Sequence, residues 1–395
     1  MVLQKESLKK PLRVELPLFT IIRMISATAY RMVYPFLPAL RDGLGVPLES
    51  LTLAIGSRSL IAAFAGPFFA SMGDSRGRKF GMLAGIFIFM AGTAVVVFWP
   101  TFSGFVIATM LTTIGQVTFG PSMQAYLGDR VPYSRRSFVL TVTEFSWSGA
   151  YIVGIPLVGL VIARGGWMAP FPLLGLLSAM AGGILWLTIP KDKAHAKAPP
   201  SFLTNFRMIM KSPAARAALG FTLFSSIANE FINLIFGVWM EDSFGLRLAA
   251  MGAAAAVLGI AEVSGEGLVA ALTDRLGKRR SIFIGLLVNS FSVLLLPLMS
   301  GNLTGALATL FLFYISFEFL IVSSIPLMTE VMPSARATML SGFFTTASIG
   351  RAAASVVTAP LYAFGITATV FAAVVFNLLA MWAIRDIELQ AEKAR

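Results

Sequence analysis

Long apolar stretches recur along this chain, each separated from the next by a short polar or charged segment. At 1.5 Å per helical residue, each is long enough to cross the roughly 30 Å of hydrocarbon in a bilayer. Backbone groups in lipid must be satisfied within their own segment, so the stretches are predicted to be transmembrane α-helices. We mark twelve, at approximately 17–40, 50–72, 80–99, 103–127, 138–163, 168–190, 216–240, 249–272, 281–300, 304–328, 338–362 and 366–385.

The composition supports a membrane protein and excludes several kinds of chemistry. Charged residues make up 13% of the chain, against about 25% in soluble proteins. Cysteine is absent, and the single histidine, His195, lies in a polar segment. We therefore expect no metal site, no cofactor and no histidine-based catalysis, so an enzyme is disfavoured. The phosphate-binding pattern G-x-x-x-x-G-K-[ST] is also absent, which argues against pumping driven by ATP.

Positive charge is distributed unevenly between the two sides of the predicted membrane. The N-terminus, every second loop and the C-terminus hold 24 of the 31 lysines and arginines, whereas the opposite loops hold only Arg41, Arg164 and Arg247. Basic loops remain in the cytoplasm, so both termini are predicted to be cytoplasmic and the protein to be multi-pass in the cell (inner) membrane. The net charge of +12 is then a topology signal, and no nucleic-acid partner is expected.

One long polar connection divides the spans into two groups of six. We predict an N-terminal six-helix bundle at 1–190, a cytoplasmic linker at 191–215 and a C-terminal six-helix bundle at 216–395. Phe202 and Phe206 in the linker suit either a short surface helix or a plain solvated connection. The halves resemble each other at an offset of 200, as in RDGLGV at 41–46 and EDSFGL at 241–246. Such duplications are typical of secondary transporters, whose substrate site lies between the repeats.

Two charged loops carry a family resemblance. The loop ASMGDSRGRKFGML follows span 2, and AALTDRLGKRR occupies the corresponding place in the second half. Both are similar to the signature loop G-x-x-x-D-R-x-G-R-R of the major facilitator superfamily. GAYIVGIPLVG in span 5 and YRMVYPFLP in span 1 resemble its drug-proton antiporter branch, although span 4 lacks the arginine that many members of that branch carry.

The resemblance implies a fold of twelve helices in two pseudo-symmetric bundles, and a gating role for the signature loops. Their glycines permit tight turns, and an aspartate at a helix end can face the positive N-terminus of a neighbouring helix. Breaking these contacts would let the bundles rock apart; alternatively, the charges only anchor the loops at the membrane surface. The candidate gating residues are Asp74, Gly77, Arg78, Lys79, Asp274, Arg275, Gly277 and Lys278.

Nine ionisable side chains lie inside predicted spans, where each costs roughly 2.5–3.5 kcal/mol at a helix centre unless it faces protein or water. The resemblance implies that spans 1, 4, 7 and 10 line the cavity, while spans 3, 6, 9 and 12, which carry none of the nine, lie outside. Arg23 and Glu144, both near the cytoplasmic side, are predicted to form a structural ion pair. The candidates for proton coupling or substrate binding are Glu230, Glu318, Glu262, Glu266, Arg351, Arg31 and Arg58.

Charge balance indicates which of these residues carries a proton. The C-terminal half has four buried glutamates against one arginine, Arg351, so burial and mutual repulsion favour a protonated carboxyl. Glu230 and Glu318 are preferred because spans 7 and 10 line the cavity. Two alternatives are a static network between helices and cross-bundle pairing of Arg31 or Arg58 with a glutamate. Other polar or aromatic candidates for the cavity, equally suited to helix–helix contacts, are Tyr30, Tyr34, Gln116, Asn229, Asn233 and Trp147.

These features predict a transporter that works by alternating access. Proton-coupled efflux of small amphipathic or cationic compounds suits the acidic C-terminal half. The alternative is an uptake symporter or uniporter for a polar or anionic solute, such as a sugar, an organic acid or a lipid headgroup. The expected partners are a small-molecule substrate, protons and the lipid bilayer, and we expect a monomer.

Overall fold

Helices account for nearly all of the computed structural model, which describes residues 12–190, 207, 209–385 and 387, and no strand occurs within those residues. Most of the predicted linker, including Phe202 and Phe206, lies outside the described residues. We call α1–α8 the N-terminal set. Its elements are α1 (Leu12–Arg31), α2 (Leu37–Leu44), α3 (Leu48–Arg76), α4 (Arg78–Phe98), α5 (Phe102–Arg130), α6 (Tyr133–Gly149), the π-helical turn η1 (Ala150–Gly154), α7 (Ile155–Gly165) and α8 (Pro170–Thr188).

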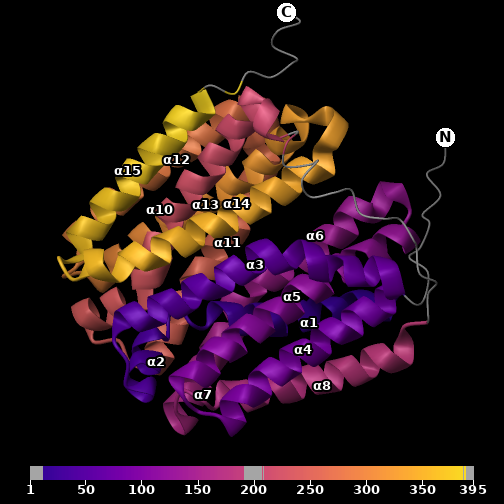
Figure 1. The fold of residues 1–395 in the computed structure, drawn as a ribbon. Coiled ribbons are helices and arrows are strands. Elements are labelled where there is room, and N and C mark those ends of the chain that lie inside the picture. The colour runs from indigo at the N-terminus through magenta and orange to yellow at the C-terminus, as the bar shows by residue number, and fades with distance from the viewer. Residues whose placement is uncertain (1–11, 191–206, 208, 386, 388–395) are drawn as a thin grey trace, which may run out of the picture.

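The C-terminal set follows the linker. Its elements are α10 (Pro213–Phe244), α11 (Leu248–Leu276), α12 (Lys278–Leu295), the short turn η2 (Pro297–Met299), α13 (Leu303–Val331), the turn η3 (Pro333–Ala335), α14 (Arg336–Tyr362) and α15 (Ile366–Arg385). Figure 1 shows the indigo-to-magenta N-terminal set in one part of the molecule and the rose-to-yellow C-terminal set in the other. Within the described residues, nine helices are long and apolar enough to cross a bilayer. Three helices at predicted spans, α1, α12 and α14, do not meet that criterion.

The repeat seen in the sequence has a counterpart in the backbone. The bounds of α3 and α11 are 200 residues apart, and each helix ends at a glycine with positive φ, Gly77 at 101° and Gly277 at 84°. Gly45 and Gly245 form a second equivalent pair, at 63° and 59°. Glycine adopts these conformations at little cost because it has no Cβ. Both signature loops are therefore one-residue turns between two long helices.

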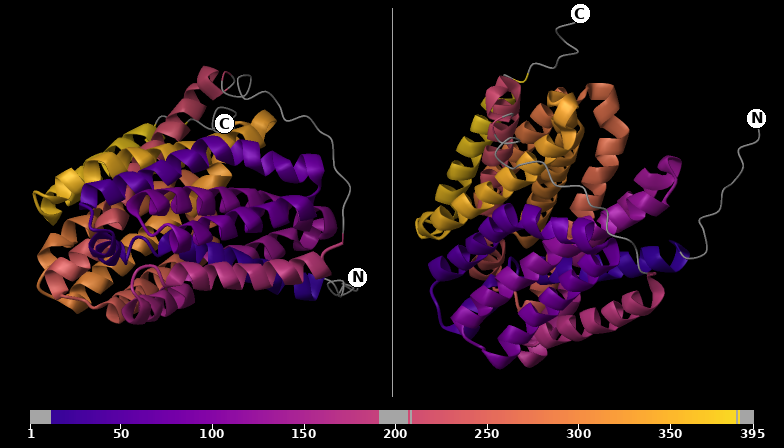
Figure 2. Two further views of the ribbon diagram at one scale, coloured as in Figure 1. Left: turned by 60° about the horizontal axis from the view of Figure 1, so that its bottom comes forward. Right: turned by 45° about the vertical axis from the view of Figure 1, so that its right-hand side comes forward.

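The two sets meet mainly where α3 packs on α14 and α7 on α11, with further contacts of α11 with α6 and η1 and of α2 with α10. Small residues permit the close approach. A Cβ on Gly56 would lie 2.8 Å from Ser355 Cβ, and a Cβ on Gly259 would lie 2.8 Å from the carbonyl oxygen of Ser148. These positions fall in the first half of α3 and of α11, at the ends away from the start of α1. Figure 2, in its right-hand view, shows the sets diverging towards the side where α1 begins and α15 ends.

Two irregular helix segments lie beside this contact. The chain leaves α1 after Arg31, passes through a turn at 32–36 and continues as α2, whose first turn contains Pro38. In the fifth predicted span, η1 interrupts the helix just before Pro156. Proline lacks the N–H of the helical ladder and its ring clashes with the preceding turn, which accounts for the wide turn at this place.

Candidate functional site

Predicted site residues from both sets, together with Tyr151 and Tyr314, form two largely buried charge clusters at the contact. The Arg31 cluster comprises Arg31, Trp147, Tyr151, Glu262, Glu266 and Glu318. The Glu230 cluster comprises Tyr30, Tyr34, Arg58, Asn229, Glu230, Asn233, Tyr314 and Arg351. The break after α1 supplies residues to both, because Tyr30 and Arg31 end α1 and Tyr34 lies in the turn that follows.

An ion pair between the two sets is the centre of the Arg31 cluster. Arg31 Nη1 donates to both carboxylate oxygens of Glu262, at 2.7 and 2.9 Å. The pair is buried, with 10% and 9% of the two side chains exposed. The guanidinium carbon also lies 4.6 Å from the centre of the Trp147 ring and 4.3 Å from that of Tyr151, so two aromatic faces stabilise the cation.

Two further carboxylates lie beside this pair. Glu266 follows Glu262 by one turn of α11 and is partly exposed, and Glu318 on α13 is opposite. A Cβ on Gly265 would lie 2.7 Å from Glu318 Cβ, so the missing side chain lets α13 approach α11 at this level. Glu262, Glu266 and Arg31 all interact electrostatically with Glu318. Within the described chain, neither Glu266 nor Glu318 accepts a hydrogen bond, and one arginine faces three carboxylates.

In the second cluster, Glu230 on α10 is completely buried and bound by neutral donors. Tyr34 Oη donates to Glu230 Oε1 at 2.9 Å, and Asn233 Nδ2 donates to Oε2 at 3.2 Å. Asn233 Nδ2 also donates to Asn229 Oδ1 at 2.8 Å, and Asn233 Oδ1 accepts from Tyr314 Oη at 2.7 Å. The amides and the two tyrosines thus connect α10 to the break after α1 and to α13.

Two arginines complete the Glu230 cluster. Arg58 on α3 is 1% exposed, its guanidinium carbon lies 3.8 Å from the centre of the Tyr30 ring, and its Nη1 donates to the Tyr30 carbonyl oxygen at 2.8 Å. Arg351 on α14 donates from Nη2 to Ser348 Oγ at 3.0 Å. Both arginines interact electrostatically with Glu230. In the described part of the chain, neither forms an ion pair within 4 Å of a carboxylate.

Arg23 and Glu144, predicted as an ion pair, lie together at the edge of the Arg31 cluster, where Glu144 interacts electrostatically with Glu266 and Glu318. Two hydrogen bonds of 2.6 and 2.9 Å join them, and Gln124 Nε2 donates to the same carboxylate at 3.2 Å. Glu144 is 44% exposed, so the pair is partly hydrated. The structure brings Gln116 to neither cluster: it lines a small internal pocket of the N-terminal set with neighbours that include Ser26 and Ser178.

The basic gating candidates contact their own set in this structure. Arg78 Nε lies 3.5 Å from Asp129 Oδ2 at the end of α5, and Lys278 pairs in the same way with Glu330 at the end of α13. Lys79 Nζ donates to the carbonyl oxygens of Trp186, at 2.7 Å, and of Ile189.

Three gating candidates remain, Asp74, Asp274 and Arg275, and the structure describes the side chains of the last two. Asp274 and Arg275 are exposed. The side chain of Asp74 lies outside the described part, so its predicted contact with a helix N-terminus stays a prediction.

Two residues of the clusters, and a glycine beside them, were not among the sequence candidates. Tyr151 stacks on Arg31, Tyr314 donates to Asn233, and Gly265 permits the approach of Glu318. A helical-spacing signal existed for two of them, because Tyr151 follows Trp147 by four residues and Tyr314 precedes Glu318 by four.

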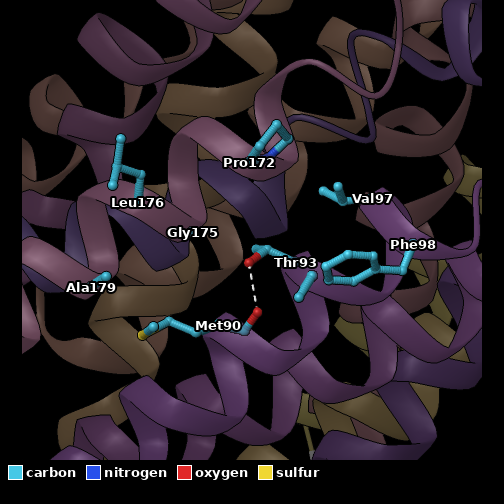
Figure 3. A pocket seen from close by; sticks show the side chains of 9 residues that line it. Met90, Thr93, Val97, Phe98, Pro172, Gly175, Leu176 and Ala179 are labelled. Carbon is cyan, nitrogen blue, oxygen red and sulfur yellow. Dashed lines mark hydrogen bonds between the residues drawn. The ribbon is translucent and has the colours of Figure 1, made fainter.

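A groove of about 270 Å³ opens between α4 and α8 (Figure 3). Its lining is apolar apart from Thr93, whose hydroxyl donates to the Met90 carbonyl oxygen at 2.8 Å. It contains none of the predicted site residues.

Comparison with known proteins identifies the family. The chain is 25% identical over 285 residues to the uncharacterized MFS-type transporter YwfA of Bacillus subtilis (strain 168), covering 71% of this chain and 69% of the relative. It is 27% identical over 293 residues to multidrug resistance protein MdtG of Enterobacter lignolyticus (strain SCF1), covering 70% and 68%.

Among solved structures, a bacterial homolog of the human lysosomal transporter Spinster superposes with a TM-score of 0.80 at 16% identity, covering 96% of this chain and 98% of that one. The family model of the Major Facilitator Superfamily matches residues 19–353 and 218–394. The chain is therefore a membrane transporter, not an enzyme, and belongs to the Major Facilitator Superfamily.

Proposed function

We propose that this transporter exchanges protons for small amphipathic or cationic compounds and moves those compounds out of the cell by alternating access. The observation that carries the proposal is the environment of the Glu318 carboxylate. Its carboxylate accepts no hydrogen bond within the described chain, while Glu262 and Glu266 lie nearby and Arg31 is already bound to Glu262. Carboxylates gathered around one cation favour protonation of one of them. Glu318 then binds either a proton or a cationic solute.

The transport cycle that we infer uses the contact between the sets as one of its two gates. With both termini in the cytoplasm, the contact between α3 and α14 and between α7 and α11 closes the outer side, and the diverging ends open inward. The Arg31–Glu262 pair links the sets at this gate. When a cation or a proton neutralises Glu266 or Glu318, the charge surrounding the Arg31–Glu262 pair changes. Binding is thereby coupled to opening of the gate.

One relative supports the efflux part of the proposal. MdtG, at 27% identity, is named as a multidrug resistance protein, which agrees with efflux of amphipathic compounds. We further propose twelve spans in two bundles, an inner-membrane location and a monomer that needs no second copy to complete the site, because both clusters form within one chain.

Proton exchange can be tested with purified protein in liposomes that contain a pH-sensitive dye. Under an imposed proton gradient, a lipophilic amine such as phenethylamine should trigger proton movement. Glu318→Gln should abolish this movement, and Glu49→Gln, which changes an exposed carboxylate at the start of α3, should preserve it. The proposal is wrong if no amine moves protons through the wild-type protein, or if Glu318→Gln exchanges as fast as wild type.

A further inference from the structure

The Glu230 cluster carries more positive charge than its own residues neutralise. Arg58 and Arg351 bring two cations, and Glu230 is the single carboxylate that the described chain places among them. Glu230 is bound by neutral donors, Tyr34 and Asn233, instead of by either guanidinium. A buried charge without a close partner is costly, so this cluster is electrostatically incomplete.

The free hydrogen-bond donors show which ligand would complete it. Arg58 uses Nη1 for the Tyr30 carbonyl oxygen, and its Nε and Nη2 have no hydrogen-bond partner among the described residues, although both are buried. These two nitrogens form one edge of the planar guanidinium, the edge that holds both oxygens of a carboxylate. The guanidinium carbon lies 3.8 Å from the centre of the Tyr30 ring and 5.3 Å from that of Tyr34. Contact with a ring face uses none of the in-plane N–H donors, so these rings do not satisfy the two nitrogens.

Arg351 supplies a further donor from the opposite set. Its Nε is also buried without a partner among the described residues. A Cβ on Gly56, two residues before Arg58, would lie 3.4 Å from the carbonyl oxygen of Ala352, the residue after Arg351. The two arginines therefore flank the close approach of α3 and α14, and one ligand between them would contact both sets.

We propose that Arg58 and Arg351 form a subsite for a carboxylate group of the transported solute. This inference rests on the proposed transport of amphipathic compounds and adds to it. Glu318 takes the cationic end of the solute, and the two guanidinium groups take an anionic end. The substrate is then dipolar, with an apolar body between an amine and a carboxylate, and its carboxylate strengthens the contact between the two sets.

Three probes of similar shape test this assignment: phenethylamine, phenylalanine and 3-phenylpropionate, which carry respectively the amine, both groups and the carboxylate. Binding to purified protein is measured by calorimetry at constant ionic strength. The wild-type protein should bind phenylalanine more tightly than phenethylamine. Arg351→Gln should weaken binding of phenylalanine and 3-phenylpropionate by about 10- to 100-fold, the effect of losing a charged hydrogen bond, and should leave phenethylamine within twofold.

Arg164→Gln, at an exposed arginine near the end of α7, is the matched control and should change none of the three affinities. The thermal stability of the empty protein provides a second measurement. If the cluster holds an uncompensated charge, Arg351→Gln raises Tm; if Arg351 serves only to hold Glu230, the same change lowers it. Arg351→Lys keeps the charge without the planar donors, so it should weaken carboxylate binding with a smaller effect on Tm.

The proposal is overturned if the wild-type protein binds neither carboxylate-bearing probe, if Arg351→Gln leaves their affinities unchanged, or if it lowers the Tm of the empty protein. A protein that still exchanges protons for phenethylamine after such a result retains the proposed function and loses only the anionic subsite. If amine-driven proton movement is absent but carboxylate binding is intact, the anionic subsite is retained and the proposed proton exchange is wrong.

Discussion

Removing one partner of the Arg31–Glu262 pair should weaken the contact between the two helix sets. In Glu262→Gln, the buried Arg31 guanidinium loses its carboxylate. Breaking a buried pair in this way costs about 3–5 kcal/mol. Trp147 and Tyr151 contact the cation at 4.6 and 4.3 Å before and after the change, so they do not alter the difference. The amide oxygen of the introduced glutamine still accepts a hydrogen bond from the guanidinium, which contributes about 1.5–3 kcal/mol. We therefore expect the closed contact to lose about 2 kcal/mol relative to the separated sets.

A single introduced cysteine can report this change, because the chain has none of its own. Ser355→Cys places a thiol at a position that is 1% exposed and packed against Gly56 of the opposite set. A maleimide can reach it only when α3 and α14 separate. A loss of about 2 kcal/mol raises the separated fraction, and with it the labelling rate, by about 30-fold.

An exposed ion pair between the same two sets provides the control. Arg41 Nη2 lies 3.3 Å from Glu241 Oε2, and 38% of the Glu241 side chain is exposed. Exposed pairs contribute at most about 1 kcal/mol, so Glu241→Gln should raise labelling by less than about fivefold. In the double variant Arg31→Gln/Glu262→Gln neither partner of the pair is left charged without the other, so labelling should fall below that of Glu262→Gln alone. Equal rates for Glu262→Gln and Glu241→Gln, or additive effects in the double variant, would refute the reasoning.

Three smaller changes test other parts of the structure. Gly259→Ala puts a methyl group 2.8 Å from the backbone oxygen of Ser148, so overpacking of about 1–3 kcal/mol should lower Tm and accelerate labelling at the same introduced cysteine; unchanged labelling would contradict this packing. Lys79→Met removes the donor to the last carbonyl groups of α8 and should cost about 1 kcal/mol, read as a fall in Tm that Lys79→Arg largely avoids. Gln116→Ala should leave proton exchange within about twofold of wild type, because Gln116 lines a pocket of the N-terminal set and belongs to neither cluster; a larger loss would place it in the transport path.

The helices and the repeat could be predicted because they depend on local patterns. An apolar run of about 20 residues has few alternatives to a helix in lipid, and matching glycines at 77 and 277 show equivalent turns without any knowledge of the fold. The juxtaposition of Arg23 and Glu144 was also within reach, since equal depth on helices expected to touch needs no further geometry. Each of these inferences needs only the position of a residue along its helix, not the direction in which its side chain points.

The grouping of charges between the sets required information that the sequence does not hold. Glu230 and Glu262 lie at similar depth, yet they belong to different clusters because their helices present them in different directions. Arg31 meets Glu262, 231 residues away, at the point where α1 ends, and the wide turn η1 determines the register in which Tyr151 stacks on it. Neither irregularity follows from an apolar pattern, although Pro35, Pro38 and Pro156 mark where each occurs.

Departures from the rules of helix formation therefore occur together in this protein. The break after α1, the π-helical turn before Pro156 and the buried charges all lie where the two helix sets meet. Each is unfavourable by itself: an interrupted helix frees backbone groups, and a charge in an apolar span must find a partner. Their concentration at one contact is what selection for a moving, ion-binding interface would retain, since stability alone would remove them. The same reasoning distinguishes the two clusters. Arg31 forms an ion pair with Glu262, whereas Arg58 and Arg351 form none within the described residues, which is why we assign them to the carboxylate of a solute.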